Sequence, residues 1–152
     1  MAADAVSGGA LLEWPVSSNA TTFVPTELGR LSALSEAQVE DPRSILDTFD
    51  SPRPDRDFEI RFEFPEFTSI CPVTGQPDFA TITVVYSPAD RCVEMKSLKL
   101  YFLAFRNKGM FYEAVTNQIF DDLHAVLSPR RLKVVGDFAV RGGTKGVVTV
   151  QS

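Results

Sequence analysis

The chain has 152 residues, of which 44% are hydrophobic and 23% charged, and its formal net charge is −5. These values are typical of one globular domain with a core of its own, and the net negative charge disfavours a general nucleic-acid binder. One histidine and two cysteines exclude a metal centre that needs several histidines, so we predict no metal site.

The N-terminal sequence lacks the basic region followed by a long apolar segment that marks a secretory signal. No apolar run approaches the roughly 20 residues needed to span a bilayer. The two cysteines, Cys71 and Cys92, do not form a disulfide framework. We therefore expect a cytoplasmic protein with reduced thiols that binds neither membranes nor nucleic acid.

Residues 1–57 differ in composition from the rest of the chain. They are rich in proline and in short polar residues, which compete with regular backbone pairing. We predict that they form a partly irregular N-terminal arm and that residues 58–152 form the main domain.

Regular alternation begins at Phe58 and runs to Phe64, with an apolar residue at every second position. A period of two predicts a strand with one buried face, and we expect Pro65 to end it. A run of β-branched residues predicts a second strand over about 79–86, which leaves 65–78 as a loop.

Residues 94–106 have apolar side chains at helical spacing on two sides. The second side is formed by Leu100, Leu103 and Ala104. A helix that is apolar on both sides is expected to be buried on both sides. Because one sheet covers only one side, this pattern favours packing against another subunit.

An apolar stripe predicts a second helix over about 110–127, which Ser128 and Pro129 end. Short strands are expected around 131–140 and 146–150. The order of the predicted elements is β-β-α-α-β-β, which indicates an α+β fold with an antiparallel sheet.

Cys71 is the strongest candidate for a nucleophile. It lies in the predicted loop, where structure alone seldom requires a cysteine, and its reactive thiolate needs a group that favours the charge or takes the proton. Asp78 is the candidate helper, because the single histidine, His124, belongs to the polar stripe of the second helix. The alternative is that Cys71 is a small buried hydrophobe, which is the interpretation we favour for Cys92.

Other charged side chains allow two interpretations. Lys96, Lys99 and Arg106 fall on one stripe of the first predicted helix, which could hold phosphate groups or be a solvated face. Glu94 and Glu113 each lie near the start of a helix, where the helix dipole favours an anion and capping is a sufficient explanation.

Four segments carry motifs that occur together in a known family. They are PEFTSICPVTGQPDFA at 65–80, EMKSLKLY at 94–101, FRNKGMFYE at 105–113 and the turn Arg141-Gly-Gly143. In order and spacing they resemble the queuosine-pathway nitrile reductases, the 7-cyano-7-deazaguanine reductases. The resemblance covers about residues 58–145.

The resemblance implies a tunnelling fold (T-fold), in which β-β-α-α-β-β subunits close into a ring-shaped barrel with substrate pockets between subunits. Single-module members of the family form two stacked pentamers, so a homodecamer is expected. This assembly agrees with the helix that is apolar on both sides.

The resemblance also implies a reaction, in which the nitrile of 7-cyano-7-deazaguanine is reduced to the amine of 7-aminomethyl-7-deazaguanine by two molecules of NADPH. Cys71 would bond to the nitrile carbon as a thioimidate, and Asp78 would donate a proton. A nitrile carbon is electrophilic but linear, and capture by sulfur converts it into a C=N group that a hydride can attack.

Two sets of binding residues follow from the same resemblance. The substrate would be bound by Val93, Glu94, Met95, Tyr112 and Glu113, and the cofactor by Lys96, Lys99 and Arg141. Glu113 would hydrogen-bond the guanine-like edge of the base. Many family members have histidine where this chain has Tyr112, and tyrosine does not titrate near neutral pH, which argues against a proton shuttle at this position.

Two other functions stay open. One is that of an amidine-forming relative, which uses the same cysteine on a nitrile-bearing base in tRNA but adds ammonia. That relative lacks the cofactor motif found here at 94–101, and the acidic charge of this chain disfavours tRNA. The other is a non-catalytic protein that binds a purine-like base without a covalent adduct.

Overall fold

The computed structural model describes residues 34–152. Residues 1–33, the greater part of the predicted arm, lie outside the described residues. No helix within 34–152 is long and apolar enough to cross a membrane.

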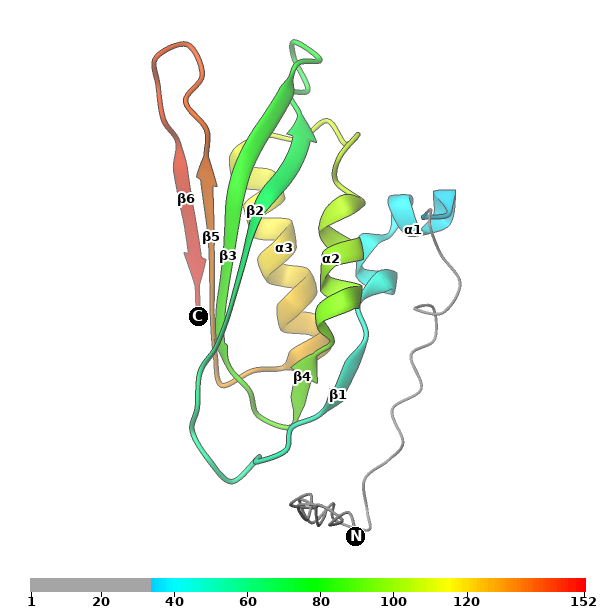
Figure 1. Ribbon diagram of the computed structural model, residues 1–152, viewed down its shortest axis with the longest axis vertical. Coiled ribbons are helices and arrows are strands. Elements are labelled where there is room, and N and C mark those ends of the chain that lie inside the picture. The colour runs from blue at the N-terminus through cyan, green and yellow to red at the C-terminus, as the bar shows by residue number, and fades with distance from the viewer. Residues whose placement is uncertain (1–33) are drawn as a thin grey trace, which may run out of the picture.

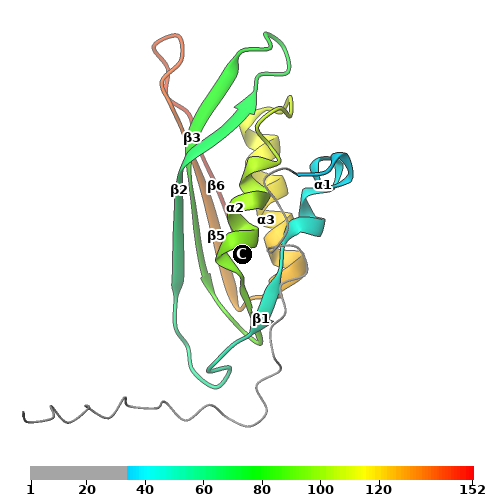
Figure 2. The ribbon, with the colours of Figure 1, turned by 45° about the vertical axis from the view of Figure 1, so that its right-hand side comes forward.

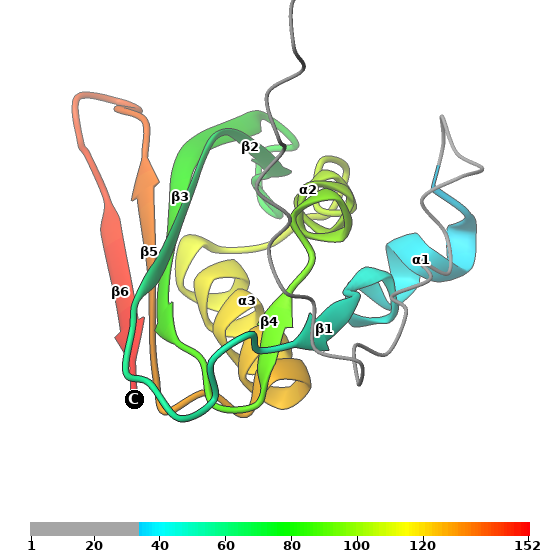
Figure 3. The ribbon, with the colours of Figure 1, turned by 60° about the horizontal axis from the view of Figure 1, so that its bottom comes forward.

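A four-stranded antiparallel sheet, in the order β2-β3-β5-β6, forms one layer of the molecule (Figure 1). Its strands are β2 (Ile60–Ile70), β3 (Pro77–Ser87), β5 (Arg131–Phe138) and β6 (Val147–Gln151). Two helices, α2 (Met95–Leu103) and α3 (Tyr112–Leu127), cover one face of this sheet (Figures 1 and 3). The predicted α+β class with an antiparallel sheet is confirmed, and these six elements follow one another in the predicted order.

Short elements that the sequence did not predict precede the sheet. They are α1 (Glu36–Glu40), the 3-10 helix η1 (Pro42–Ile45) and β1 (Thr48–Asp50), which pairs with β4 (Arg91–Val93) in a second antiparallel sheet. Figure 2 shows this segment on the side of the helices that faces away from the four-stranded sheet. It therefore forms a third layer over the helices.

We expected one chain to leave the second apolar side of this helix uncovered. This prediction is wrong for two of its three residues, Leu100 and Ala104, and holds for Leu103. Ala104 is buried in the core and Leu100 packs against it, whereas Leu103 is 39% exposed. Helix α2 contacts η1, whose Ile45 belongs to the same core. The periodicity of the helix could not show this, because the covering residues lie far away in the sequence.

Strand β2 does not end at Pro65 as predicted but continues to Ile70. Its pairing with β3 changes register after Phe64, so that Pro65 lies in a β-bulge. A bulge tolerates proline because its extra residue takes no part in the hydrogen-bond ladder. The predicted loop therefore shrinks to the turn 71–76.

Close packing fixes α3 against the sheet. A Cβ atom at Gly136 of β5 would lie 2.7 Å from Oγ1 of Thr116 on α3, so glycine is what permits this approach. Between the helices, the hydroxyl of the buried Tyr101 donates to Oδ2 of Asp122 at 2.9 Å. These contacts define where the first turn of α3 lies relative to β3 and β5.

Candidate active site

The bulge in β2 determines the face of the sheet on which Cys71 lies. Before the bulge the helix-facing residues are even-numbered, such as Phe62, and after it they are odd-numbered, as the buried Phe67 and Ser69 show. Side chains alternate along a strand, so one extra residue exchanges the two faces. Cys71 continues the odd-numbered set, and Ser69 pairs with Asp78. The bulge thus puts Cys71 on the same face as Asp78.

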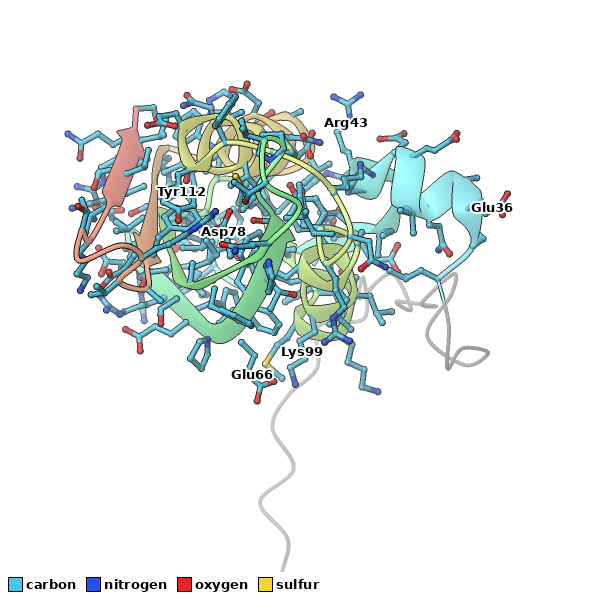
Figure 4. The ribbon with its side chains drawn as sticks, turned by 90° about the horizontal axis from the view of Figure 1, so that it is seen from above. Glu36, Arg43, Glu66, Asp78, Lys99 and Tyr112 are labelled. Carbon is cyan, nitrogen blue, oxygen red and sulfur yellow. The ribbon has the colours of Figure 1, made fainter. Side chains whose placement is uncertain are left out.

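Asp78 occupies a core position at the start of β3, in line with the buried Ala80, and its side chain is 2% exposed. A buried carboxylate is unfavourable unless it is paired. Here Nη1 of Arg141 forms an ion pair with Oδ1 of Asp78 at 2.6 Å, and the hydroxyl of Tyr112 donates to the same oxygen at 3.0 Å. Figure 4, which looks onto the end of the molecule that holds the turn, shows Asp78 and Tyr112 side by side.

Tyr112 is the first residue of α3, and its ring packs against Phe138 and lies close to Gly146. The ring stacks on Phe138 with centroids 3.8 Å apart and planes 8° from parallel. A Cβ atom at Gly146 would lie 3.3 Å from the same ring. Burial, followed by the hydrogen bond to Asp78, raises the pKa of Tyr112, so its hydroxyl keeps its proton at neutral pH and remains a donor.

The turn that follows β2 is fixed by backbone hydrogen bonds. The amide of Cys71 donates to the carbonyl of Gln76, and the amide of Gly75 donates to the carbonyl of Cys71, both at 2.9 Å. Gly75 has a φ of 69°, in the left-handed region that glycine adopts without strain. On its other side, Ile70 exchanges backbone hydrogen bonds of 2.9 and 3.0 Å with the connection between α2 and α3.

The groups of this turn stabilise the thiolate of Cys71. Hydrogen bonds lower the pKa of Cys71 to about 7, first from the Thr74 hydroxyl, then from the amides of Thr74 and Val73, with a smaller contribution from Arg141. The side chain of Cys71 is partly exposed, so a reactant can reach it. A large fraction of Cys71 is therefore thiolate at neutral pH, which is the state that a nucleophile needs.

Arg141 lies in the loop between β5 and β6. Arg141 and Thr144 exchange backbone hydrogen bonds of 2.9 and 3.1 Å across Gly142 and Gly143, whose φ values are 57° and 78°. Two consecutive residues with positive φ are typical of a tight hairpin turn. Nη1 of Arg141 contacts Asp78, and Nη2 donates to Oγ1 of Thr74 at 2.7 Å.

The predicted site residues therefore separate into two groups within one chain. Cys71, Asp78, Tyr112 and Arg141 come together at the end that carries the β2–β3 turn. Val93, Glu94 and Met95 lie where β4 leads into α2, at the opposite end of the molecule (Figures 1 and 2). Oε2 of Glu94 accepts from the amide of Ser97 at 2.7 Å and so caps α2. One chain alone does not bring these two groups together.

Three further predicted residues expose their charged groups. Lys96 and Lys99 lie on the surface of α2, and Glu113 lies in the first turn of α3. Within residues 34–152 the side chains of all three form no hydrogen bond or ion pair. The two lysines are therefore available to a ligand as cations, and Glu113 is available as a hydrogen-bond acceptor.

Two residues of the site were not predicted from the sequence. Thr74 contacts both Cys71 and Arg141, and its place in a turn beside the candidate nucleophile was the available signal. Ser69 is fully buried opposite Asp78, and its hydroxyl has no hydrogen-bond partner among the described residues. No signal in the sequence indicated Ser69, because its burial depends on the bulge.

Cys92 and His124 behave as expected for residues outside the site. Cys92 is buried in β4, and burial raises its pKa. His124 is exposed on α3, where its ring stacks on Phe120.

Comparison with known proteins agrees with the motifs. Residues 77–152 match the model of a family described as QueF-like protein. A protein of Anaeromyxobacter sp. (strain K) is 64% identical over 110 residues, which cover 72% of this chain and 90% of that protein. A protein of Chlorobium luteolum is 57% identical over 71% of this chain and 93% of its own length. A protein of Magnetococcus marinus is 52% identical over 77% of this chain and 91% of its own length. All three are named NADPH-dependent 7-cyano-7-deazaguanine reductase.

A solved structure shares the fold. The apo form of the archaeosine synthase QueF-Like aligns with a TM-score of 0.59 and 19% sequence identity, covering 62% of this chain and 92% of that one. At this identity the likeness concerns the fold alone. The family match and the relatives at 52–64% identity show that this chain belongs to the QueF-like family, as its motifs indicated.

Proposed function

We propose that this chain is an NADPH-dependent 7-cyano-7-deazaguanine reductase, which converts a nitrile to a primary amine in queuosine biosynthesis. The observation that carries the proposal is that Cys71, whose pKa is lowered to about 7, and the buried carboxylate of Asp78 lie at the same end of the sheet and on the same face. The names of relatives that are 52–64% identical supply the substrate class and the cofactor.

Cys71 and Asp78 carry the covalent chemistry in this proposal. The thiolate of Cys71 adds to the nitrile carbon, and the nitrogen that becomes negative takes a proton from Asp78, which gives a thioimidate. Cys71 leaves again as thiolate after the first reduction, and Asp78, which takes a new proton from water, serves the second protonation. Tyr112 holds Asp78 in place, and Glu113 hydrogen-bonds the guanine-like edge of the base.

The surface of α2 fits the charge of a dinucleotide. NADPH supplies the two hydrides of the reaction when it is bound. Lys96 and Lys99 are exposed cations without partners among the described residues, and phosphate groups are bound well by such ammonium groups. Figure 4 shows Lys99 pointing outward from α2.

Oxidation of NADPH by the purified chain tests the proposed function. We expect NADPH absorbance to fall only when 7-cyano-7-deazaguanine is present, with two NADPH consumed for each amine formed. An amidine formed from ammonia without NADPH consumption would instead identify the amidine-forming alternative. Binding of the base with neither an adduct nor turnover would identify the non-catalytic binder.

Alanine substitutions on α2 test the cofactor site. Lys96→Ala and Lys99→Ala should each raise the KM for NADPH roughly fivefold or more, because each removes a charge-assisted contact to a phosphate. The KM for the nitrile should change less. Lys133→Ala, which removes an exposed lysine from β5, is the matched control. Unchanged NADPH affinity in both α2 variants would show that this stripe is only a solvated face.

We also propose that the chain forms a T-fold ring, in which two pentamers stack as a homodecamer. The two outer strands of the four-stranded sheet, β2 and β6, are each paired on one side only within the described residues, and edge strands of this kind pair between subunits. The separation of the two groups of site residues supports shared active sites.

A hollow of about 360 Å³ lies beside the turn. It is lined by residues of β2 and β3 and by Gly75, Arg106 and Asn107, and its lining does not include Cys71.

Light scattering tests this assembly. We expect a mass of about ten chains for the active protein, and Leu103→Glu should reduce both the mass and the activity because Leu103 is the exposed member of its helix face. Leu103→Ala, which adds no charge, is the matched control and should keep the assembly. A fully active monomer at assay concentration would contradict the proposal.

The remaining expectations fit this function. We propose residues 58–152 as the catalytic domain, because they hold every proposed catalytic and binding residue. The reaction needs a small nitrile and NADPH, both of which are found in the cytoplasm, and it involves neither a membrane nor a nucleic acid.

A further inference from the structure

Arg141 contacts both halves of the proposed catalytic pair. Its Nη1 atom lies 2.6 Å from Oδ1 of Asp78, and its Nη2 atom donates to Oγ1 of Thr74 at 2.7 Å. Thr74 lies in the same turn as Cys71, and its hydroxyl contributes most to the lowered pKa of Cys71. A single guanidinium thus bridges the group that stabilises the nucleophile and the group that handles the proton.

The bridge depends on the shape of the arginine side chain. A guanidinium is planar and presents its donors in a fixed fork, whereas an ammonium is a single point charge. The base of the loop is also fixed, because the amide of Ala139 donates to the carbonyl of Phe79 at 2.8 Å. Since the strand of Asp78 and the loop of Arg141 are joined in this way, the fork meets Thr74 and Asp78 in one defined arrangement.

We propose that Arg141 is a positioning residue for capture of the nitrile, which holds Thr74 against Cys71 and holds Asp78 where the nitrogen becomes negative. This inference rests on the proposed function. It assigns Arg141 to the step that precedes any use of NADPH, whereas the family resemblance implies cofactor binding.

In the capture step the nitrile carbon reacts with Cys71 while the nitrile nitrogen accepts a proton. A lone pair of the Cys71 sulfur forms the C–S bond, one π bond of the nitrile breaks, and its electron pair moves to nitrogen. Asp78 receives the proton that the Cys71 thiol loses when it becomes a thiolate, and it gives that proton to the nitrogen, so the step needs no oxidant or reductant. Holding the two reacting groups in the correct positions relative to the nitrile lowers the activation barrier of this step.

The first test uses iodoacetamide and requires neither the nitrile nor NADPH. Alkylation of Cys71 is followed from pH 5 to 10, with peptide mass spectrometry to separate it from Cys92. Among the titratable and charged groups around Cys71, Arg141 from its loop contributes to the lowered pKa of Cys71. Arg141 also donates to Asp78 of β3, which accepts a second hydrogen bond from Tyr112 of α3. Lys108, in the connection between α2 and α3, directs its ammonium group to the carbonyl of Glu40 instead.

Arg141→Met should shift the midpoint of alkylation upward from about 7, because the variant removes the guanidinium that holds Thr74 and contributes to the thiolate. The rate at pH 7 should fall roughly fivefold or more, since only the thiolate reacts. Lys145→Met is the matched control, because Lys145 lies in the same loop but pairs with Asp137 at 2.9 Å. It should leave the midpoint unchanged.

The second test measures formation of the covalent adduct from 7-cyano-7-deazaguanine by intact mass, with no NADPH present. Arg141→Met should form the adduct roughly tenfold more slowly or worse, and Lys145→Met at the parent rate. Arg141→Lys keeps the charge but lacks the fork, so it should also be slow, and it serves as the test if Arg141→Met does not fold.

Normal alkylation and adduct formation in the Arg141 variants, with only a raised KM for NADPH, would overturn the inference and leave Arg141 as a cofactor-binding residue. Failure of the parent chain to form any adduct would count against the proposed function instead. In that case the alkylation profile alone would still decide whether Arg141 positions the groups around Cys71.

Discussion

Cys71→Ala is expected to abolish the covalent adduct and to lower turnover by roughly 10³ or more, because the hydride would then have to attack a linear nitrile directly. In the parent chain, adduct formation should become faster as the pH rises through about 7, since the pKa of Cys71 is lowered to about that value and the thiolate is the nucleophile. Intact mass and NADPH consumption measure the two effects separately.

The control for this prediction is Cys92→Ala. Cys92 is 2% exposed in β4, and burial raises its pKa, so its thiol is inert at neutral pH. Its removal should lower thermal stability by leaving a small cavity, while adduct and turnover persist. An adduct that remains in Cys71→Ala would contradict the proposed mechanism, and an adduct found on Cys92 would reassign the nucleophile.

Asp78→Asn should lower kcat by roughly 10² or more, because asparagine has the size of aspartate but cannot pass a proton to the nitrogen. The loss should appear in turnover rather than in affinity for NADPH, since Asp78 lies on the sheet and not on α2. Steady-state kinetics with both substrates separate these parameters.

Asp137→Asn is the matched control for Asp78→Asn. Asp137 belongs to the neighbouring strand β5 and also pairs with a basic residue of the β5–β6 loop, Lys145. Its substitution removes an equivalent charge without touching Tyr112 or Arg141, so turnover should stay near that of the parent. Near-normal turnover of Asp78→Asn would remove Asp78 from the mechanism.

The arrangement around Asp78 shows how a charged group is kept in a core position. Three elements contribute to it, namely the start of β3, the first turn of α3 and the loop after β5. The ion pair with Arg141 and the hydrogen bond from Tyr112 both act on Oδ1, and they offset the cost of burying the carboxylate. Tyr112 keeps its proton at neutral pH and thus acts as a fixed donor where histidine would titrate.

The sequence was sufficient for the two long helices, for the order of the four strands of the main sheet and for the family. Alternation over Phe58 to Phe64 predicted the start of β2, and apolar stripes predicted α2 and α3, because burial of one face leaves a periodic signature in adjacent residues. The motif around Cys71 and Asp78 identified the family, since the proposed nucleophile and the proposed proton donor lie close together in the chain. These features depend on residues that are close together in the chain.

The tertiary structure decided what depends on distant residues. It continued β2 through Pro65 by a bulge, which placed Cys71 on the face of Asp78, and it packed η1, which contains Ile45, against α2. It also brought Arg141 to Thr74 and Asp78, 67 and 63 residues away in the sequence. A sequence pattern indicates which residues are buried. It does not indicate which distant residues cover them or pair with them, because these contacts depend on the packing of the whole chain.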